Sequence, residues 1–282
     1  MVLEAAQKGS GLNWERIELF EGDWPDLSAV AREAWAERLA DWFDLQLLFV
    51  DHLVHHHNLS YADALTHYTA LFKRLGFGHP NQQADTAAWR HFVATVRNQP
   101  SRQRRLQTVV DYAKSKLVSY SHYTYREFGC FGFDPPDKTG AVHLHFNPKN
   151  DRSAFGALDR RRADVRKAEL VEMVVYIRRQ FGTEAQTLHG ASWLYSLEAY
   201  RRLFPDEFAA SARIYKEPQF RCRGISVWGQ FIDRDDSLKP DLRDTFIRHL
   251  TDLKLDALWW IFPFPLHVAS APISPVRSRP VR

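Results

Sequence analysis

The sequence predicts a helical N-terminal module followed by an α/β or α+β domain with a mixed sheet. In the first 120 residues, apolar side chains recur at the three- and four-residue spacing of amphipathic helices. After residue 120, alternating apolar and polar segments appear between further helical segments. The 282 residues are 45% hydrophobic and 26% charged, which is typical of a globular protein and excludes collagen-like, disulfide-scaffold and largely disordered chains. We divide the chain into an N-terminal extension (1–24), a helical module (25–120), an α/β domain that carries the candidate site (121–271) and a disordered basic tail (272–282).

Four helices are expected in the helical module. Pro25 and Asp26 mark the start of the first helix. Ser60 and Asp63 have the spacing of a capping box, which opens the second helix, and Gly76 is placed to end it. The expected helices cover residues 26–57, 60–75, 86–97 and 102–117.

Strands and helices are expected to alternate in the second domain. Residues 141–146 alternate between apolar side chains on one face and two histidines on the other. Pro205 disfavours helical geometry in the residue before it, so a short helix after residue 196 should end near 204. A change of apolar phase across Gly224 indicates a bulge in the longest predicted strand. The expected strands are 141–146, 187–195, 220–232 and 257–262, and the expected helices are 163–181, 196–204 and 242–253.

The composition predicts a cytoplasmic protein without a membrane segment. Cys130 and Cys222 form no C-x-x-C pair, which suits a reducing compartment and argues against a cysteine-built zinc site. Residues 1–24 lack the features of a secretory signal. The uncharged stretch 257–276 is long enough to cross a bilayer, but its four prolines remove backbone donors and exclude a transmembrane helix.

The net charge of +4 hides opposite charges in neighbouring segments. Residues 1–72 contain 12 acidic and 4 basic residues, whereas residues 73–120 contain 2 acidic and 9 basic residues. Acidic and basic helices that pack side by side explain this segregation, and a basic face for an anionic partner is the alternative. Basic residues of the second segment form a stripe that has no interleaved aromatic residues and no recognisable nucleic-acid-binding motif, so we do not expect a nucleic-acid partner. Its members are Arg97, Arg102, Arg104, Arg105, Lys114 and Lys116.

The sharpest candidate site is the pair His143 and His145. Alternation places both imidazoles on one face of a strand, with Asn147 at the same parity. Such a pair can share acid–base work, ligate a metal ion or form a hydrogen-bonded structural pair. A metal site needs a third ligand. The candidates for it are His189, Asp159 and His122.

Two further groups of residues complete the expected site. In the basic segment 151–167, between the histidine strand and a helix start, Arg160 and Arg162 can bind a phosphate or carboxylate. A solvated basic helix start is the alternative interpretation. Polar and aromatic residues near the ends of later strands are expected to form a substrate pocket. They are His189, Ser192, Trp193, Tyr195, Trp228 and Gln230.

A second histidine cluster lies near the end of the first helix. It contains His52, His55, His56 and His57, next to Asp51. The chain has no Glu-x-x-His spacing of the kind used in carboxylate-bridged metal bundles. We therefore favour imidazoles that interact with the carbonyl groups at a helix C-terminus over a metal site.

The order of elements over residues 140–232 resembles the central part of the GNAT superfamily of N-acyltransferases. The order is a strand, a charged loop, a long helix, a strand, a short helix with Tyr200 and a further strand, and it covers about a third of the chain. The resemblance implies that residues 154–162 hold the pyrophosphate of acyl-CoA and that Tyr200 is the general acid. Arginines stand here where the family's Q/R-x-x-G-x-G/A loop has glycines.

Together these observations predict an enzyme that acts on a small polar or anionic substrate. Acyl transfer from acyl-CoA is the leading hypothesis. The expected roles are His143 or His145 as base, Arg160 and Arg162 as anion ligands, Tyr200 as acid, and Trp193 and Trp228 as pocket walls. A metal-dependent hydrolase or oxygenase with a divalent metal at His143 and His145 is the first alternative. A non-enzymatic binding or regulatory protein with a basic helical surface over 97–116 is the second.

Overall fold

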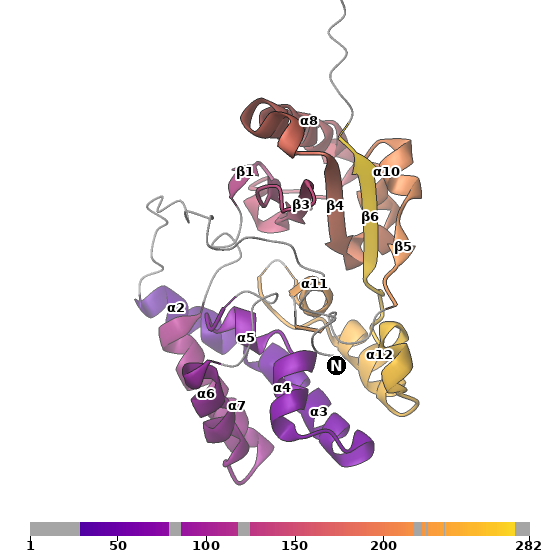
Figure 1. The fold of residues 1–282 in the computed structure, drawn as a ribbon. Helices are drawn as coiled ribbons and strands as arrows, with labels where there is room; N and C mark the ends of the chain where they lie inside the picture. The colour runs from indigo at the N-terminus through magenta and orange to yellow at the C-terminus, as the bar shows by residue number, and fades with distance from the viewer. Residues whose placement is uncertain are drawn as a thin grey trace, which may run out of the picture.

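The structure, a computed structural model, describes residues 29–78, 86–117, 125–216, 222–223, 225–233 and 235–273. The chain forms a helical lobe and a sheet lobe. In Figure 1 the sheet lobe lies above the helical lobe. The structure confirms the predicted fold class, with N-terminal helices before a mixed sheet. The N-terminal extension, His122, Gly224 and the tail after Ile273 lie outside the described residues.

In the described residues, six helices begin the helical lobe, and three of them start after a residue whose side chain caps the helix. Ser60, Thr86 and Ser101 each accept a hydrogen bond on the side-chain oxygen from the backbone N–H three residues later. This confirms the cap at Ser60 and the predicted starts of the next two helices. The six are α2 (Ala29–Arg38), α3 (Ala40–His57), α4 (Tyr61–Tyr68), α5 (Leu71–Arg74), α6 (Ala87–Arg97) and α7 (Arg102–Lys116).

Two of the predicted helices are each divided in the structure. Leu39 separates α2 from α3, yet its N–H donates to the Trp35 carbonyl (3.2 Å) and its carbonyl accepts from the Phe43 N–H (2.9 Å). The apolar spacing therefore continues across this break and does not reveal it. The second predicted helix is divided between α4 and α5 at Thr69, which is extended, before the chain turns at Gly76 with a φ of 73°.

A six-stranded mixed sheet forms the centre of the sheet lobe, in the order β1-β2-β3-β4-β6-β5. Strands β1, β2 and β3 form an antiparallel meander, β4 is parallel to β3, and β6 is antiparallel to both β4 and β5. The sequence prediction includes β3 and all of β4, which it extends by three residues, and omits the other four strands. The strands are β1 (Arg126–Phe128), β2 (Phe131–Phe133), β3 (Ala141–Phe146), β4 (Thr187–Ser192), β5 (Arg213–Ile214) and β6 (His267–Pro272).

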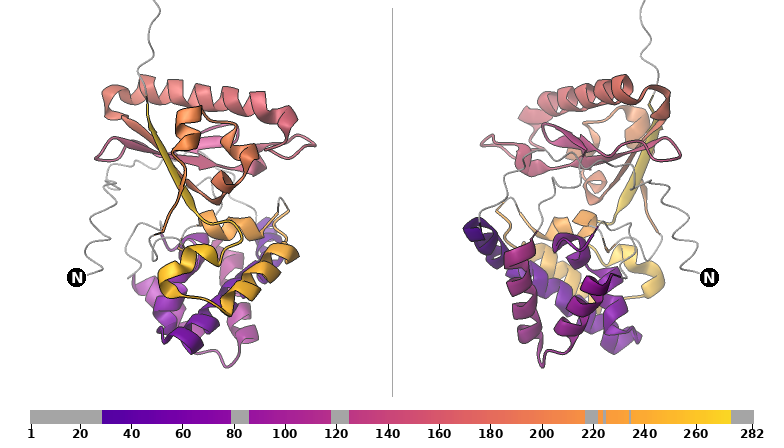
Figure 2. Two further views of the ribbon diagram at one scale, coloured as in Figure 1. Left: turned by 90° about the vertical axis from the view of Figure 1, so that its right-hand side faces the viewer. Right: turned by 60° about the vertical axis from the view of Figure 1, so that its left-hand side comes forward.

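Helix α8 (Ala163–Phe181) connects the parallel strands β3 and β4 and has the predicted bounds. Its buried residues Leu170, Met173 and Ile177 pack into the core on one face of the sheet. The short helices α9 (Glu198–Arg201) and α10 (Asp206–Ala210) contribute to the same core. Figure 2 shows α8 on the side of the sheet that faces away from the helical lobe. The opposite face of the sheet is therefore the one that faces the helical lobe.

The chain then returns to the helical lobe, where two predicted strands are wrong. Residues 220–232 include the helix α11 (Ile225–Trp228), and residues 257–262 lie largely in a 3-10 helix (Leu255–Trp260). Trp228 and Phe246, the latter on α12 (Pro240–Leu250), place their rings 5.9 and 5.3 Å from that of Phe49 on α3. A short apolar run fits a strand or a buried helix equally well, and here the second alternative holds.

The buried apolar residues form two cores that do not follow the predicted domain boundary. One core joins helices α2–α7 with apolar residues between 222 and 266, and the other joins the sheet with α8–α10. The segment 222–266 was assigned to the α/β domain from the sequence but packs in the helical core. Strand β6 follows this segment and enters the sheet between β4 and β5.

An ion cluster around the buried Asp236 joins the two lobes. Lys149, in the loop after β3, places its Nζ 2.5 Å from an Asp236 carboxylate oxygen, and Arg74 of α5 lies 4.0 Å from the same oxygen. The guanidinium of Arg74 also stacks 4.5 Å from the ring of Trp35. These contacts hold the β3–α8 loop against the helical lobe.

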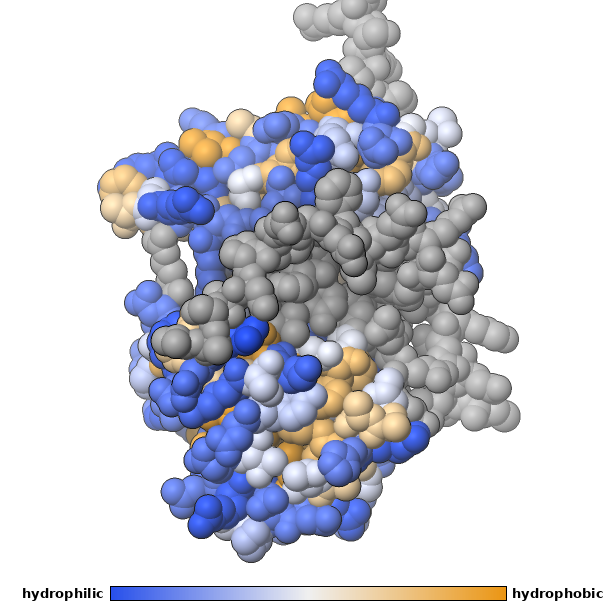
Figure 3. Space-filling model, turned by 90° about the vertical axis from the view of Figure 1, so that its left-hand side faces the viewer, coloured by the Kyte–Doolittle hydropathy of each residue, from blue (hydrophilic) through white to orange (hydrophobic). Residues whose placement is uncertain are grey.

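No helix in the described ranges is both long and apolar enough to cross a membrane. Figure 3 shows hydrophilic side chains over most of one side of both lobes, with apolar side chains gathered mainly on the helical lobe. Cys130 and Cys222 are both buried and form no disulfide with each other.

Candidate functional site

Three histidines lie on the sheet face that is turned toward the helical lobe. On β3, His143 and His145 alternate with Val142 and Leu144, which are buried in the sheet core, so the predicted common face is confirmed. His189 of β4 is the register partner of His143, and their ring centroids are 6.0 Å apart. The side chains of His143 and His145 are 39% and 36% exposed, so a small molecule can reach both. We call this surface the histidine face.

Asp137 holds its carboxylate beside His143 through a tight turn. One carboxylate oxygen accepts hydrogen bonds from the Thr139 N–H (2.8 Å), the Thr139 hydroxyl (2.6 Å) and the Ala141 N–H (3.0 Å). The other oxygen lies 3.6 Å from Nε2 of His143. Burial alone would raise the pKa of Asp137, but these hydrogen bonds outweigh it and lower the pKa below its ordinary value. Asp137 is therefore an anion next to His143.

Asp134 makes a closer contact with His145. An oxygen of its buried carboxylate lies 2.8 Å from Nε2 of His145. Nε2 is buried and makes no hydrogen bond with the described residues in this geometry, so the contact with Asp134 is electrostatic, and Nδ1 is the ring nitrogen left for a ligand. Lys73 of α5 in the helical lobe interacts electrostatically with Asp134, which by itself would raise the pKa of Lys73. Burial nevertheless lowers the pKa of Lys73 to about 8. The surroundings of His145 thus come from both lobes.

His189 has a polar but uncharged partner. Its Nε2 lies 3.0 Å from the hydroxyl of Thr187 on the same strand. Burial, and then the neighbouring His143, lower the pKa of His189 below its ordinary value. His189 is therefore a neutral imidazole near pH 7, able to donate or accept one hydrogen bond on the histidine face.

The strands β3 and β4 separate beside these histidines. Their pairing ends at Leu144 and Gly190, although both strands continue for two more residues. On the core side, the hydroxyl of Tyr195 lies directly against Gly190. A Cβ added to Gly190 would be 1.9 Å from the Tyr195 hydroxyl oxygen. On the histidine face, the next residue of β4 is the exposed Ala191. The last pair of the two strands is thus covered by Tyr195 on the core side, whereas the side of the histidines is exposed at Ala191.

Several predicted pocket residues near the end of β4 have structural contacts instead. Ser192 accepts a hydrogen bond from the Leu194 N–H (3.1 Å) and caps the following 3-10 turn. Trp193 stacks on Phe264, with ring centroids 5.5 Å apart. In the described part of the chain, no contact links Ser192 or Trp193 to the three histidines.

Tyr195 and Tyr200 are inside the sheet core. Each is 1% exposed, and their ring centroids are 5.0 Å apart. Tyr200 also packs against Phe146 and Phe204, with ring centroids at 5.1 and 5.0 Å. Burial raises the pKa of Tyr200 well above its ordinary value. In this position Tyr200 is a core residue that holds its proton tightly and does not face the histidines.

Trp228 and Gln230 belong to the core of the helical lobe. The indole of Trp228 donates to the Cys222 carbonyl (2.9 Å). The side-chain amide of Gln230 donates to the carbonyls of Val227 (2.8 Å) and Phe264 (3.2 Å), and its oxygen accepts from the Phe264 N–H (2.9 Å). The structure therefore separates these two predicted site residues from the histidine face.

The basic loop between β3 and α8 retains two exposed cations, Arg152 and Arg160, that form no ion pair with a described carboxylate. Arg162 lies 3.3 Å from the buried carboxylate of Asp151, and Arg161 is paired with Asp159 at 2.8 Å. Arg160 is exposed and has no ion pair with any described carboxylate. Asn147 caps the 3-10 turn after β3 by accepting from the Lys149 N–H (3.2 Å). Arg160 is therefore the stronger of the two predicted anion ligands.

In the described ranges, no group of three or more His, Cys, Asp or Glu side chains is arranged to hold a metal ion. At the second histidine cluster, the ring centroids of His52 and His56 are 4.5 Å apart. Nδ1 of His55 lies 2.6 Å from the carbonyl of Asp51, in agreement with the predicted contact to helix carbonyls. The carboxylate of Asp51 is itself bound by both terminal nitrogens of Arg105, at 2.7 and 3.1 Å.

The segregated charges of the helical module pair with one another. Besides the Asp51–Arg105 pair, Arg102 lies 3.0 Å from Asp44, and Lys114 contacts Glu33 and Glu37 at 3.5 and 3.1 Å. These ion pairs join α7 to α2 and α3, as the side-by-side packing of acidic and basic helices predicts.

Three charged residues of the site were not selected from the sequence. Asp134 and Asp137 flank two prolines just before the histidine strand, and this Asp-Pro-Pro-Asp segment is a turn signal that could have drawn attention to them. Lys73 reaches Asp134 only because the helical lobe packs against the sheet, and no local pattern indicates that.

Comparison of the chain with protein-family models, with curated proteins and with solved structures finds no match in any of the three.

Proposed function

We propose that this chain is an acyltransferase of the GNAT type, which transfers an acyl group from acyl-CoA to a small amine. One observation carries the proposal. The parallel strands β3 and β4, bridged by α8, separate after Leu144 and Gly190, and His145 with its Asp134 partner stands at that point on the histidine face. The order of β3, charged loop, α8, β4 and the short helix α9 also supports it, whereas the last predicted strand of the resemblance is helical.

In the proposed reaction, His145 is the general base. The acceptor nitrogen attacks the thioester carbonyl carbon and forms a C–N bond, Nδ1 of His145 takes the proton from that nitrogen, and the C–S bond breaks as CoA leaves as a thiolate. Asp134, 2.8 Å from Nε2, stabilises the imidazolium that results. A thiol has an ordinary pKa of about 8.5, so the thiolate can leave without a dedicated acid. The buried Tyr200 therefore has no role in this scheme.

Arg160 is proposed to bind the phosphate groups of acyl-CoA. It lies in the 3-10 turn Arg160–Arg162, at the start of α8, where guanidinium and backbone N–H groups favour phosphate. Because Arg162 is already paired with Asp151, Arg160→Ala should weaken CoA binding more than Arg162→Ala, and both effects should decrease in high salt. Isothermal titration of the protein with CoA at two salt concentrations measures this.

The role of His145 can be tested by following CoA release from acetyl-CoA with a panel of small amines. His145→Gln should reduce kcat by about 10² to 10⁴ with little change in the affinity for CoA, since it removes the base and not the phosphate ligands. Asp134→Asn should reduce kcat less and shift the pH–rate profile, because it changes the state of His145 without removing it. His91→Gln, at an exposed position on α6, is the matched control.

Wild-type activity in His145→Gln would refute the proposed base. If the wild-type protein neither binds CoA nor releases it from acetyl-CoA with any amine of the panel, the acyltransferase proposal itself is wrong.

A further inference from the structure

The strand register places His145 and Arg213 at the two ends of one row across the sheet. His145 is one residue beyond the last β3–β4 pair and is therefore level with Ala191. Ala191 is paired with Val268 of β6, and Val268 is paired with Arg213 of β5. Laterally paired residues point to the same face, so all four belong to the histidine face. The row consists of a base, two apolar residues and a cation.

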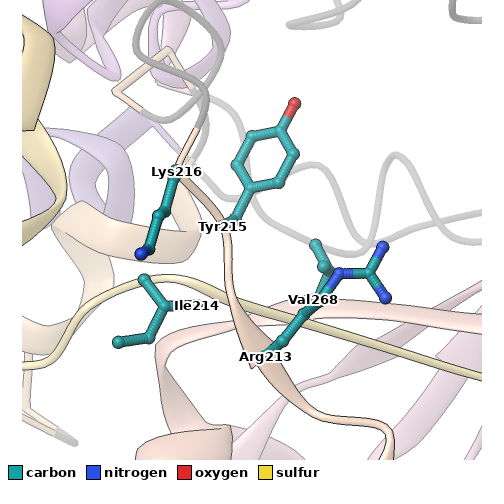
Figure 4. A pocket seen from close by; sticks show the side chains of 5 residues that line it. All are labelled: Arg213, Ile214, Tyr215, Lys216 and Val268. Atoms are coloured by element: carbon teal, nitrogen blue, oxygen red, sulfur yellow. The ribbon is translucent and has the colours of Figure 1, made fainter.

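A pocket of about 590 Å³ lies at the Arg213 end of this row. Figure 4 shows the side chains of Arg213 and Val268 on the same side of the strands, next to each other. The lining residues are Arg213, Ile214, Tyr215, Lys216 and Val268. Figure 4 also shows Ile214 and Lys216 on the opposite side of the strand from Arg213 and Tyr215, so the side that carries Arg213 has one cation, one phenol and the apolar Val268, and no acidic residue lines the pocket.

The charge of this pocket is not neutralised within the described part of the chain. Arg213 and Lys216 are both exposed and form no ion pair with a described carboxylate. Lys216 instead places its Nζ 5.6 Å from the ring centroid of Trp259. In this respect the pocket differs from α7 and the β3–α8 loop, where Arg102, Arg105, Arg161 and Arg162 already have a carboxylate partner. An unpaired arginine beside an apolar floor is a suitable ligand for a carboxylate or phosphate, which it can bind with two parallel hydrogen bonds.

The spacing along the row limits the size of a molecule that could contact both ends. Two strand spacings of about 4.8 Å separate the backbones of Ala191 and Arg213, and β3 is no longer paired with β4 at His145, so the backbones of His145 and Arg213 are at least about 14 Å apart. The imidazole and the guanidinium stand on the same face and can lean toward each other over Ala191 and Val268. Ala191 is exposed, so the surface between the two ends is accessible.

We infer that the histidine face binds an acyl acceptor with an anionic end, whose carboxylate or phosphate contacts Arg213 while its amine lies at His145. The inference rests on the proposed acyltransferase function and names the class of its acceptor. An ω-amino acid with several methylene groups fits this arrangement, because its chain would cover Ala191 and Val268.

The test uses three acceptors of equal length that differ only at one end. They are 5-aminovalerate, its neutral amide and 1,5-diaminopentane. Binding of each to the full chain is measured by isothermal titration, and acetyl transfer to each by CoA release from acetyl-CoA. We expect 5-aminovalerate to bind at least about tenfold more tightly than the amide and the diamine. Arg213→Ala should abolish this preference, and Arg213→Lys should retain part of it. Arg179→Ala, at an exposed position of α8 on the other side of the sheet, should not change it.

The two proposals fail in distinguishable ways. Binding of 5-aminovalerate that depends on Arg213, without acetyl transfer, refutes the acyltransferase and leaves the anion site intact. Acetyl transfer with no preference for the anionic acceptor, or with an unchanged preference in Arg213→Ala, overturns the acceptor class and leaves the acyltransferase intact. No detectable binding of 5-aminovalerate to the wild-type protein also overturns the acceptor class.

Discussion

Replacing Gly190 with alanine tests how closely Tyr195 packs beneath the point where β3 and β4 separate. The added Cβ would lie 1.9 Å from the Tyr195 hydroxyl and 2.8 Å from the ring carbon that carries it. Tyr195 cannot easily move away, because its ring is 5.0, 5.7 and 6.0 Å from those of Tyr200, Phe204 and Phe208. One methyl group must therefore displace a ring in a packed core.

Overpacking of this kind typically costs about 1 to 3 kcal/mol of unfolding free energy. Glycine-to-alanine exchange at an unstrained position instead adds about 0.4 to 1 kcal/mol of stability by restricting the unfolded chain. Urea unfolding followed by far-UV circular dichroism separates the two outcomes by the sign of the shift in the midpoint. Gly156→Ala is the matched control, since its Cβ would have no neighbour within 4 Å and its stability should be unchanged or slightly higher.

Tyr195→Phe provides a second check, because it removes the nearer of the two atoms. The double variant Gly190→Ala/Tyr195→Phe should recover part of the loss, and only part, since the ring carbon at 2.8 Å remains too close. A Gly190→Ala protein as stable as the wild type, or a double variant whose loss is the sum of the two single losses, would show that Tyr195 does not lie against β4.

Three other changes test the electrostatic and polar contacts. A double-mutant cycle on Asp51→Ala and Arg105→Ala should give a coupling of about 1 kcal/mol that decreases in high salt, and zero coupling would contradict the bidentate pair. The pKa of folded Lys73 is about 8, below the ordinary 10.5, so the unfolded chain binds more protons between these values and stability should rise with pH across that window. Lys73→Met should lack this rise, which amounts to up to about 3 kcal/mol, and equal slopes for the two proteins would disprove the shift. Gln230→Leu should cost about 2 kcal/mol by leaving partly buried backbone groups of Phe264 unpaired, whereas a stable variant with altered substrate binding would return Gln230 to the site.

Local patterns predicted the helices with clear caps or strong periodicity. The bounds of α8 follow from its apolar spacing, and the starts of α4, α6 and α7 follow from Ser60, Thr86 and Ser101. Cap residues and spacing act within one or two turns of helix, so they can be read without knowing the rest of the chain. Short apolar runs such as 257–262 have no such local determinant, and their packing partners decide their conformation.

For the candidate site, the sequence predicted that His143 and His145 share one face but not what they contact. The alternation of side chains in a strand is a property of the backbone, so it applies wherever the strand lies. The carboxylates beside them come from a turn, and His189 becomes a neighbour only through the parallel pairing of β3 with β4. Trp228 and Gln230 were misassigned because their segment was taken for a strand of the sheet, when it packs in the helical core.

The sequence by itself determined the helical module, the histidine strand, the long helix after it and the opposite charges of the N-terminal segments. All of these depend on residues close together in the chain. The tertiary structure alone decided that residues 222–266 join the helical lobe, that Lys73 lies near the Asp134–His145 pair, and that Arg213 stands in the same row as His145. Each of these contacts joins residues that are far apart in sequence, and their proximity results from the burial of apolar surface, which is non-directional and leaves no local signature in the chain.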